Sequence, residues 1–151
     1  MTTSEFWKSY LKATNQSEEN AVYSGELVFE DTGFTGETQL SLVLSGAKTA
    51  IFTPLESIEV NLENIPVVGE TYVVLDPSDE PHCIIELTDV TIVPLNEISW
   101  DLARRDGENE NLEEWRGKMR EFLEDEADLC GFTPREDSKI VCEIFHVVYR
   151  K

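Results

Sequence analysis

The stretch that decides the fold covers residues 44–53 and reads Leu-Ser-Gly-Ala-Lys-Thr-Ala-Ile-Phe-Thr. It joins a helical pattern that opens at Thr35 to a β-branched and aromatic run that is typical of a strand. Gly46 is well placed to end the helix in the left-handed conformation, and Pro54 ends the strand. The sequence therefore predicts a helix, a sharp turn and a strand, with Lys48 at the mouth of that strand.

Outward from this stretch, helices and strands are interspersed, as in an α+β protein. Two runs, 71–75 and 83–93, are joined by a loop rich in Pro, Asp and Ser, which indicates an antiparallel pair. Both faces of the last run are largely apolar, so we expect one face to line a barrel and the other to lie under a helix. The expected helices cover residues 5–14 (capped by Ser4), 35–46, one turn near 55–60, 96–104 and a long segment after Asn111, and the expected strands cover residues 49–53, 71–75, 83–93 and 139–150.

The long helix has the clearest signals. Asn111 is a favourable N-cap, and Glu114 three residues later completes a box-like pattern. Leu112, Trp115, Met119 and Phe122 then repeat at spacings of three and four residues, so we expect this stripe to be core. Trp115 is accordingly predicted to be buried rather than to serve as a stacking platform.

Length and charge limit the function. The 151 residues predict a single domain over 1–151, with 1–20 as an N-terminal helical extension. The formal net charge of −19 makes the chain a poor binder of duplex DNA or long RNA, because such binding depends on Lys and Arg displacing counterions. A local pocket for one base, nucleoside or short single strand remains compatible with this charge. The acidity is equally explained as a means of keeping the protein soluble.

Cysteine and histidine usage argues against metal sites and disulfides. The three cysteines are far apart and form no Cys-x-x-Cys pair, so a reducing cytoplasm is the simplest interpretation. Cys142 and His146 would share a strand face, but two ligands are too few for zinc. We expect no metal and no cofactor. The sequence also has no apolar run of membrane-spanning length and no signal peptide pattern.

Two residues stand out from their surroundings. Lys48 could direct an ammonium group into a cleft, although a lysine that complements the end of a helix is the simpler interpretation. Glu86 shares a strand face with apolar residues, so it needs a partner or a raised pKa. That partner could be Lys48, and function and structure are equally good explanations. An acidic cluster, Asp106, Glu108 and Glu110, precedes the long helix, and spacing alone singles out none of its members.

An ordered series of short motifs resembles the ASCH family, in its larger bacterial branch. The resemblance runs from about Tyr23 to Arg150, and no single motif in it is specific. The motifs are Leu44–Ala50, Pro66–Glu70, Val74–Asp76, Cys83–Glu86, Glu108 shortly before Leu112-x-x-Trp115-Arg116, and Val141–Arg150. The resemblance implies a PUA-like β-barrel of mainly antiparallel strands flanked by helices. It also implies a nucleobase, nucleoside or RNA ligand in a cleft beside the Gly-x-Lys segment.

Some small members of this family hydrolyse the amide of N4-acetylcytidine, and the resemblance implies residues for that reaction. The catalytic lysine corresponds to Lys48 and the assisting glutamate to Glu108. The nucleophilic threonine does not correspond, because its position is Ile51, and the arginine two residues further on corresponds to Thr53. A hydroxyl from Thr49 or Thr53 would be nearly 7 Å away along the strand, far beyond the ~0.5 Å tolerance of a catalytic group.

These departures favour a binding module over an enzyme. Lys48 would contact a carbonyl or phosphate, Glu86 or Glu108 would accept from an exocyclic amine, and Thr49 and Thr53 would be ligand contacts. The alternative is an amidohydrolase that acts on N4-acylated cytidine. A ribonuclease is a third hypothesis, disfavoured by the charge and by two histidines without an obvious catalytic partner. The oligomeric state is left open.

Overall fold

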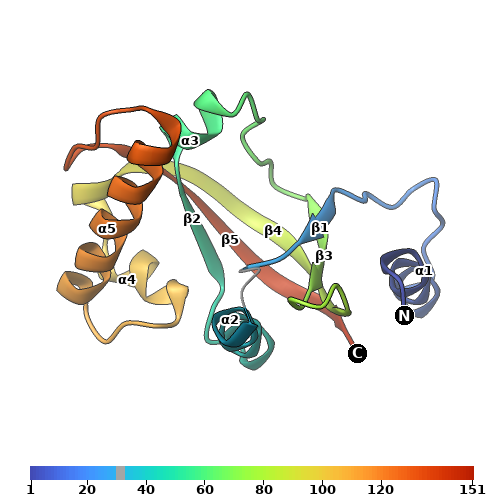
Figure 1. Ribbon diagram of the computed structural model, residues 1–151. Coiled ribbons are helices and arrows are strands. Elements are labelled where there is room, and N and C mark those ends of the chain that lie inside the picture. Colours follow the sequence, from blue (N-terminus) through green and yellow to red (C-terminus); the bar gives the residue numbers. More distant parts are fainter. Residues whose placement is uncertain (30–32) are drawn as a thin grey trace. The chain divides into compact units, whose positions relative to one another are not determined.

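The structure is a computed structural model that describes residues 1–29 and 33–151 (Figure 1). Its elements confirm the α+β class. Among the helices of the described residues, none has an apolar stretch long enough to cross a membrane. The helices are α1 (Thr3–Ala13), α2 (Gly33–Ser45), α3 (Leu55–Val60), α4 (Trp100–Ala103) and α5 (Leu112–Cys130), with the 3-10 turns η1 (Leu95–Glu97) and η2 (Arg104–Asp106). The strands are β1 (Gly25–Leu27), β2 (Ala50–Pro54), β3 (Thr71–Leu75), β4 (Pro81–Pro94) and β5 (Lys139–Arg150).

The strands form one mixed sheet in the order β1-β3-β4-β5-β2 (Figure 1). The β3–β4 pair is antiparallel, as expected. The β2–β5 pair is also antiparallel, whereas β1 is parallel to β3. The sequence did not predict β1, which has only three residues. Three residues are too few to show a recognisable alternation of apolar and polar side chains. Residues 25–27 are therefore identified as a strand only by their pairing with β3.

The chain divides into two compact units, each with its own core. The first comprises residues 1–47, 68–88 and 145–151, and the second comprises residues 48–67 and 89–144. The core of the first unit contains Phe6, Tyr10, Leu11, Val73, Leu75 and Ile84. The core of the second unit contains Ala50, Phe52, Leu95, Ile98, Ala103, Trp115, Met119, Leu123, Ile140 and Cys142.

Several expected boundaries need correction. The N-cap of α1 is Thr2 rather than Ser4, because the Thr2 hydroxyl accepts a hydrogen bond from the Glu5 N–H at 3.1 Å. The single helix expected over 96–104 is divided into η1, α4 and η2. Ser99 is in an extended conformation and caps α4 through its hydroxyl, which interrupts the helix at that point.

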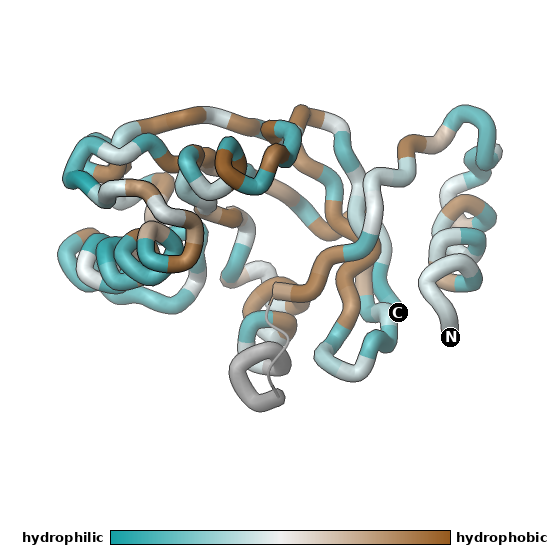
Figure 2. Tube along the Cα trace, turned by 45° about the horizontal axis from the view of Figure 1, so that its top comes forward, coloured by the Kyte–Doolittle hydropathy of each residue, from teal (hydrophilic) through white to brown (hydrophobic). Residues whose placement is uncertain are grey.

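The apolar stripe of α5 is confirmed at Trp115 and Met119 and is wrong at Phe122. Trp115 is 1% exposed and Phe122 is 42% exposed, whereas Leu123 is buried. The buried residues Trp115, Met119, Leu123 and Ala127 repeat every four positions, so the helix packs along its i, i+4 ridge. Most of α5 is hydrophilic in Figure 2, which agrees with one narrow buried stripe.

The helix-ending glycine of α5 gives a first testable prediction. Gly131 has φ +82°, and an added Cβ would meet nothing within 4 Å. Gly131→Ala should therefore lower the free energy of unfolding by about 1 kcal/mol through backbone strain alone. Gly117, inside the same helix, also has open space around it, so Gly117→Ala should raise stability by about 0.5–1 kcal/mol. Urea unfolding of both variants checks the expected difference in sign.

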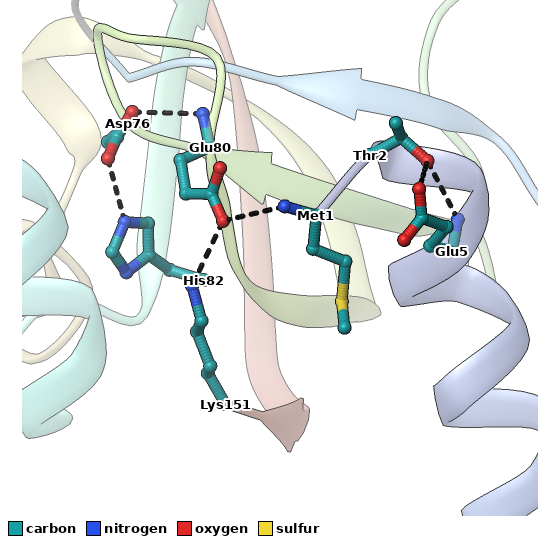
Figure 3. Close-up of polar contacts among 7 residues, drawn as sticks. All are labelled: Met1, Thr2, Glu5, Asp76, Glu80, His82 and Lys151. Carbon is teal, nitrogen blue, oxygen red and sulfur yellow. Dashed lines mark hydrogen bonds and ion pairs between the residues drawn. The ribbon is translucent and has the colours of Figure 1, made fainter.

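A polar network in the first unit surrounds the loop between β3 and β4 (Figure 3). Glu80 accepts hydrogen bonds from the N-terminal ammonium at 3.2 Å and from Lys151 Nζ at 3.1 Å. Asp76 Oδ2 lies 2.8 Å from His82 Nε2, and Asp76 Oδ1 accepts from the backbone N–H groups of Ser78 and Glu80. Burial by itself would raise the pKa of Asp76, but the hydrogen bonds from His82 and the two N–H groups outweigh it, so the net pKa is lowered.

The lowered pKa of Asp76 predicts a pH-dependent contribution to stability. A carboxyl whose folded pKa is lowered stabilises above its unfolded pKa and loses that stabilisation as the pH falls through the folded value. The stability difference between wild type and Asp76→Asn should therefore be largest above pH ~4 and shrink below it. Asp79→Asn, an exposed change of equal charge in the same loop, is the control. Denaturant titrations between pH 7 and pH 2.5 measure both.

Candidate functional site

Lys48 is held in an ion pair within the second unit. Its side chain is 7% exposed, and its Nζ contacts Asp106 Oδ1 and lies 3.5 Å from the Asp106 carbonyl oxygen. The other carboxylate oxygen, Asp106 Oδ2, accepts a hydrogen bond from the Trp115 indole N–H at 3.0 Å. Asp106 thus connects the ammonium group to the tryptophan in the core, and a buried ammonium group needs such a partner.

The residue after Lys48 is also bound to η2. The Thr49 N–H donates to the Arg105 carbonyl oxygen at 2.8 Å, and Arg105 Nη1 lies 3.4 Å from the Thr49 hydroxyl oxygen. Consecutive residues at the entrance of β2 are therefore held by consecutive residues of η2. This arrangement positions the strand that follows.

Strand β2 has two different faces. Ala50 and Phe52 belong to the core of the second unit, and Phe52 meets Trp115 edge-on with ring centroids 5.0 Å apart. Ile51 and Thr53 alternate with them, so they lie on the opposite face of the strand. Thr49, the residue directly before β2, is in phase with them, and all three are half-buried.

The neighbouring strand adds a carboxylate to that face. Glu143 of β5 is directly opposite Ile51, and Val141 is opposite Thr53. Directly paired residues point to the same side of a sheet, so Glu143 and Ile51 share a face. Glu143 is only 7% exposed. We call Thr49, Ile51, Thr53, Val141 and Glu143 the β2–β5 face.

The β2–β5 face combines hydrogen-bonding groups with apolar surface. A carboxylate accepts hydrogen bonds, and a threonine hydroxyl both donates and accepts. Proteins recognise unstacked bases through such groups at the base edges and through apolar or aromatic contact with the base plane. Buried carboxylates gather at functional sites, although structural networks bury them as well.

Glu86 lies in the first unit, in a separate pocket. It is half-buried on β4 and is paired with Thr71 of β3. The pocket has a volume of about 140 Å³. Its lining includes the rings of Trp7 and Tyr10 and the amides of Gln16 and Asn20, together with Glu86. Glu86 therefore lies among aromatic and polar groups, and a role in ligand contact stays a prediction.

The contacts above involve Lys48 but not Glu108, the other member of the predicted catalytic pair. The ion pair of Lys48 shown by the structure is with Asp106, a member of the acidic cluster from which the sequence could not choose. Glu108 is exposed and follows Gly107, which has φ +86°. The assignment of Lys48 and Glu108 to catalysis stays a prediction.

Glu143 was missed as a site residue, although the sequence contains a signal for it. It lies between Val141 and Phe145 on one face of an expected strand, which is the same pattern that singled out Glu86. Asp106 could not be singled out in this way, because its partners Lys48 and Trp115 are brought to it by the fold.

The two buried cysteines, Cys83 and Cys142, do not provide a nucleophile. Burial raises the pKa of Cys83 to about 12 and that of Cys142 to about 12, so both stay protonated thiols at neutral pH. Among the described residues, no group of three or more His, Cys, Asp and Glu side chains could hold a metal ion. Cys142 is in the core and His146 is exposed, so the structure gives them separate environments.

Comparisons with known proteins agree with the resemblance seen in the sequence. Residues 26–149 match the family model of the ASCH domain. The structure is similar to a crystal structure of an ASCH domain from Lactobacillus crispatus JV V101, with 30% identity, a TM-score of 0.86 and coverage of 97% of this chain and 94% of that one. It is also similar to a protein from Enterococcus faecalis V583, with 27% identity, a TM-score of 0.83 and coverage of 97% and 88%. A search of curated proteins finds no significant match.

Proposed function

Because this chain belongs to the ASCH domain family, we propose that it binds a nucleobase, a nucleoside or a short single strand of RNA on the β2–β5 face beside Lys48. The observation that carries the proposal is the position of Glu143, a nearly buried carboxylate directly opposite Ile51. Both residues lie on the sheet face opposite to that of the core residues Ala50 and Phe52. The expected fold supports it as well, since the chain has the α+β architecture of ASCH domain structures.

The chemistry of the face favours an uncharged base over a phosphate chain. Glu143 would accept from an exocyclic amine, and the hydroxyls of Thr49 and Thr53 would bond to neighbouring atoms of the base edge. The half-buried side chain of Ile51 would contact the base plane. With a net charge of −19, long RNA would be repelled, so a ligand with few phosphates is the best fit.

Binding without turnover fits the residues better than hydrolysis. The side chain of Lys48 is already held in an ion pair with Asp106. Ile51 has no hydroxyl to act as nucleophile. Lys48 would instead keep the entrance of β2 in place and present positive charge close to the face.

Calorimetric titration of the full chain with cytidine, N4-acetylcytidine and a short oligouridine tests the proposal. Glu143→Gln and Thr53→Val should each weaken binding about tenfold, the loss of one good hydrogen bond to a ligand. Thr53→Val keeps the side-chain shape, so it guards against a folding defect in Glu143→Gln. Glu63→Gln, an exposed change of equal charge, should have no effect.

The same titrations distinguish binding on the β2–β5 face from binding in the pocket lined by Glu86. Glu86→Gln should leave affinity unchanged if the ligand lies on the β2–β5 face. Loss of binding in Glu86→Gln, with none in Glu143→Gln or Thr53→Val, would move the site to the pocket of the first unit. Absence of saturable binding by all three ligands would overturn the proposal.

Ile51→Thr tests the hydrolytic alternative. Wild type should release no cytidine from N4-acetylcytidine, because no hydroxyl occupies this position. The substitution puts a hydroxyl opposite Glu143, so weak cytidine release is expected in the variant only. Chromatography of the products under identical conditions gives the answer. Turnover by wild type that persists in Ile51→Ala and is lost in Lys48→Ala would show that the protein is an enzyme with another nucleophile.

A further inference from the structure

The first unit contains a second open pocket, about 410 Å³ in volume, between α1 and the segment that leads into β1. The size lies within the range of small-molecule sites. Two of its walls are aromatic, two residues are acidic, and none of the described residues that line it is basic. The lining residues are Thr3, Ser4, Trp7, Glu18, Tyr23 and Glu26.

The aromatic walls meet as a corner. The ring centroids of Trp7 and Tyr23 are 5.1 Å apart, and the ring planes are inclined by 68°. Trp7 is half-buried and its ring also contacts that of Tyr10, one turn further along α1, whereas Tyr23 is 47% exposed. An exposed tyrosine beside a fixed tryptophan leaves aromatic surface open to a ligand.

The charges in the pocket favour a positively charged ligand. Glu18 and Glu26 contribute two carboxylates, and the chain as a whole has a net charge of −19. Thr3 and Ser4 belong to the first turn of α1, and a helix N-terminus acts as roughly half a positive charge. Two full negative charges outweigh that half charge. Burial first, and the charge of Glu26 second, raise the pKa of Tyr23, so its hydroxyl stays neutral.

We propose that this pocket binds a small free alkylammonium cation, with Trp7 and Tyr23 as the aromatic walls and Glu18 and Glu26 as the counter-charges. An alkylammonium group is attracted to the faces of Trp and Tyr rings, and such contacts strengthen as the cation loses water. The carboxylates add Coulombic attraction, and Thr3 and Ser4 offer hydroxyl oxygens to any N–H or O–H of the ligand. The two pockets of this unit share Trp7, but Glu86 does not line this one.

Titration calorimetry with choline and with its neutral isostere 3,3-dimethylbutan-1-ol tests the inference. The experiment uses the full chain in 150 mM salt, where the Debye length of about 8 Å screens general attraction to an acidic surface. We expect choline to bind saturably and the isostere to bind at least tenfold more weakly. Equal binding of the two compounds would show that charge plays no part and would overturn the inference.

Matched variants separate the pocket from the overall charge. Glu18→Gln/Glu26→Gln and, separately, Tyr23→Leu should each weaken choline binding at least tenfold. Glu63→Gln/Glu121→Gln removes the same charge from exposed positions of the second unit and should change affinity less than twofold. Equal weakening by both charge variants would indicate diffuse attraction and would contradict a pocket. A peptide with one trimethyllysine is titrated in parallel, and binding of that peptide without binding of free choline would also contradict the inference.

Discussion

Trp115→Ala is expected to lower the free energy of unfolding by about 3–5 kcal/mol, the cost of removing a large aromatic side chain from a packed core. Trp115 is 1% exposed and contacts Phe52 edge-on, so its removal leaves a cavity between α5 and β2. It also removes the indole N–H that donates to Asp106. Chemical denaturation monitored by circular dichroism measures the loss.

Two further variants are controls for Trp115→Ala. Phe122→Ala, on the same helix but at a position that is 42% exposed, should cost less than about 1 kcal/mol. Trp115→Phe keeps most of the ring volume and should therefore cost less than Trp115→Ala. A large loss in Phe122→Ala with a small one in Trp115→Ala would refute the packing of α5.

Asp106→Asn is expected to have the second largest effect, a loss of about 3 kcal/mol, because it removes the carboxylate charge that is paired with the buried ammonium group of Lys48. The side chain of Lys48 is 7% exposed and that of Asp106 is 21% exposed. The reverse substitution, Lys48→Met, should cost less, since the remaining carboxylate is closer to water and keeps the hydrogen bond from Trp115.

The double variant Lys48→Met/Asp106→Asn decides whether the charge itself is responsible. Because both charges of the pair are removed, the double variant should be more stable than Asp106→Asn alone. A double-mutant cycle gives the coupling free energy between the two residues. Additive losses would mean that Lys48 and Asp106 stabilise the fold independently. In that case the pair would not position β2, and the proposal that Lys48 keeps the β2–β5 face in place would fail.

Much of the fold could be predicted because its signals are local. Gly46 ends α2 with φ +83°, and Asn111 caps α5 by accepting from the Glu114 N–H at 2.8 Å. The one-turn helix α3 and the strands β3 and β5 have the expected bounds. These features depend on residues within about four positions of one another, so a single segment contains the whole signal.

The candidate site could be predicted only in part. Ile51 and Thr53 share a face of β2, because alternation along a strand is local, whereas the expected strand residue Thr49 lies directly before β2. The partner of Lys48 could not be predicted, since Asp106 is 58 residues away and two other acids lie beside it in the sequence. The choice between Phe122 and Leu123 for the core also depended on packing, because both positions lie close to the apolar stripe of α5.

The sequence by itself determined the α+β class, the positions of most helices and strands, and the membership of the chain in the ASCH domain family. The tertiary structure alone decided that β1 pairs with β3, that Asp106 forms an ion pair with Lys48, and that Glu143 lies opposite Ile51. The physical reason is the sequence separation over which each interaction acts. Caps, turns and alternation are set by neighbours along the chain, whereas register and the pairing of buried charges depend on which distant segments exclude water together.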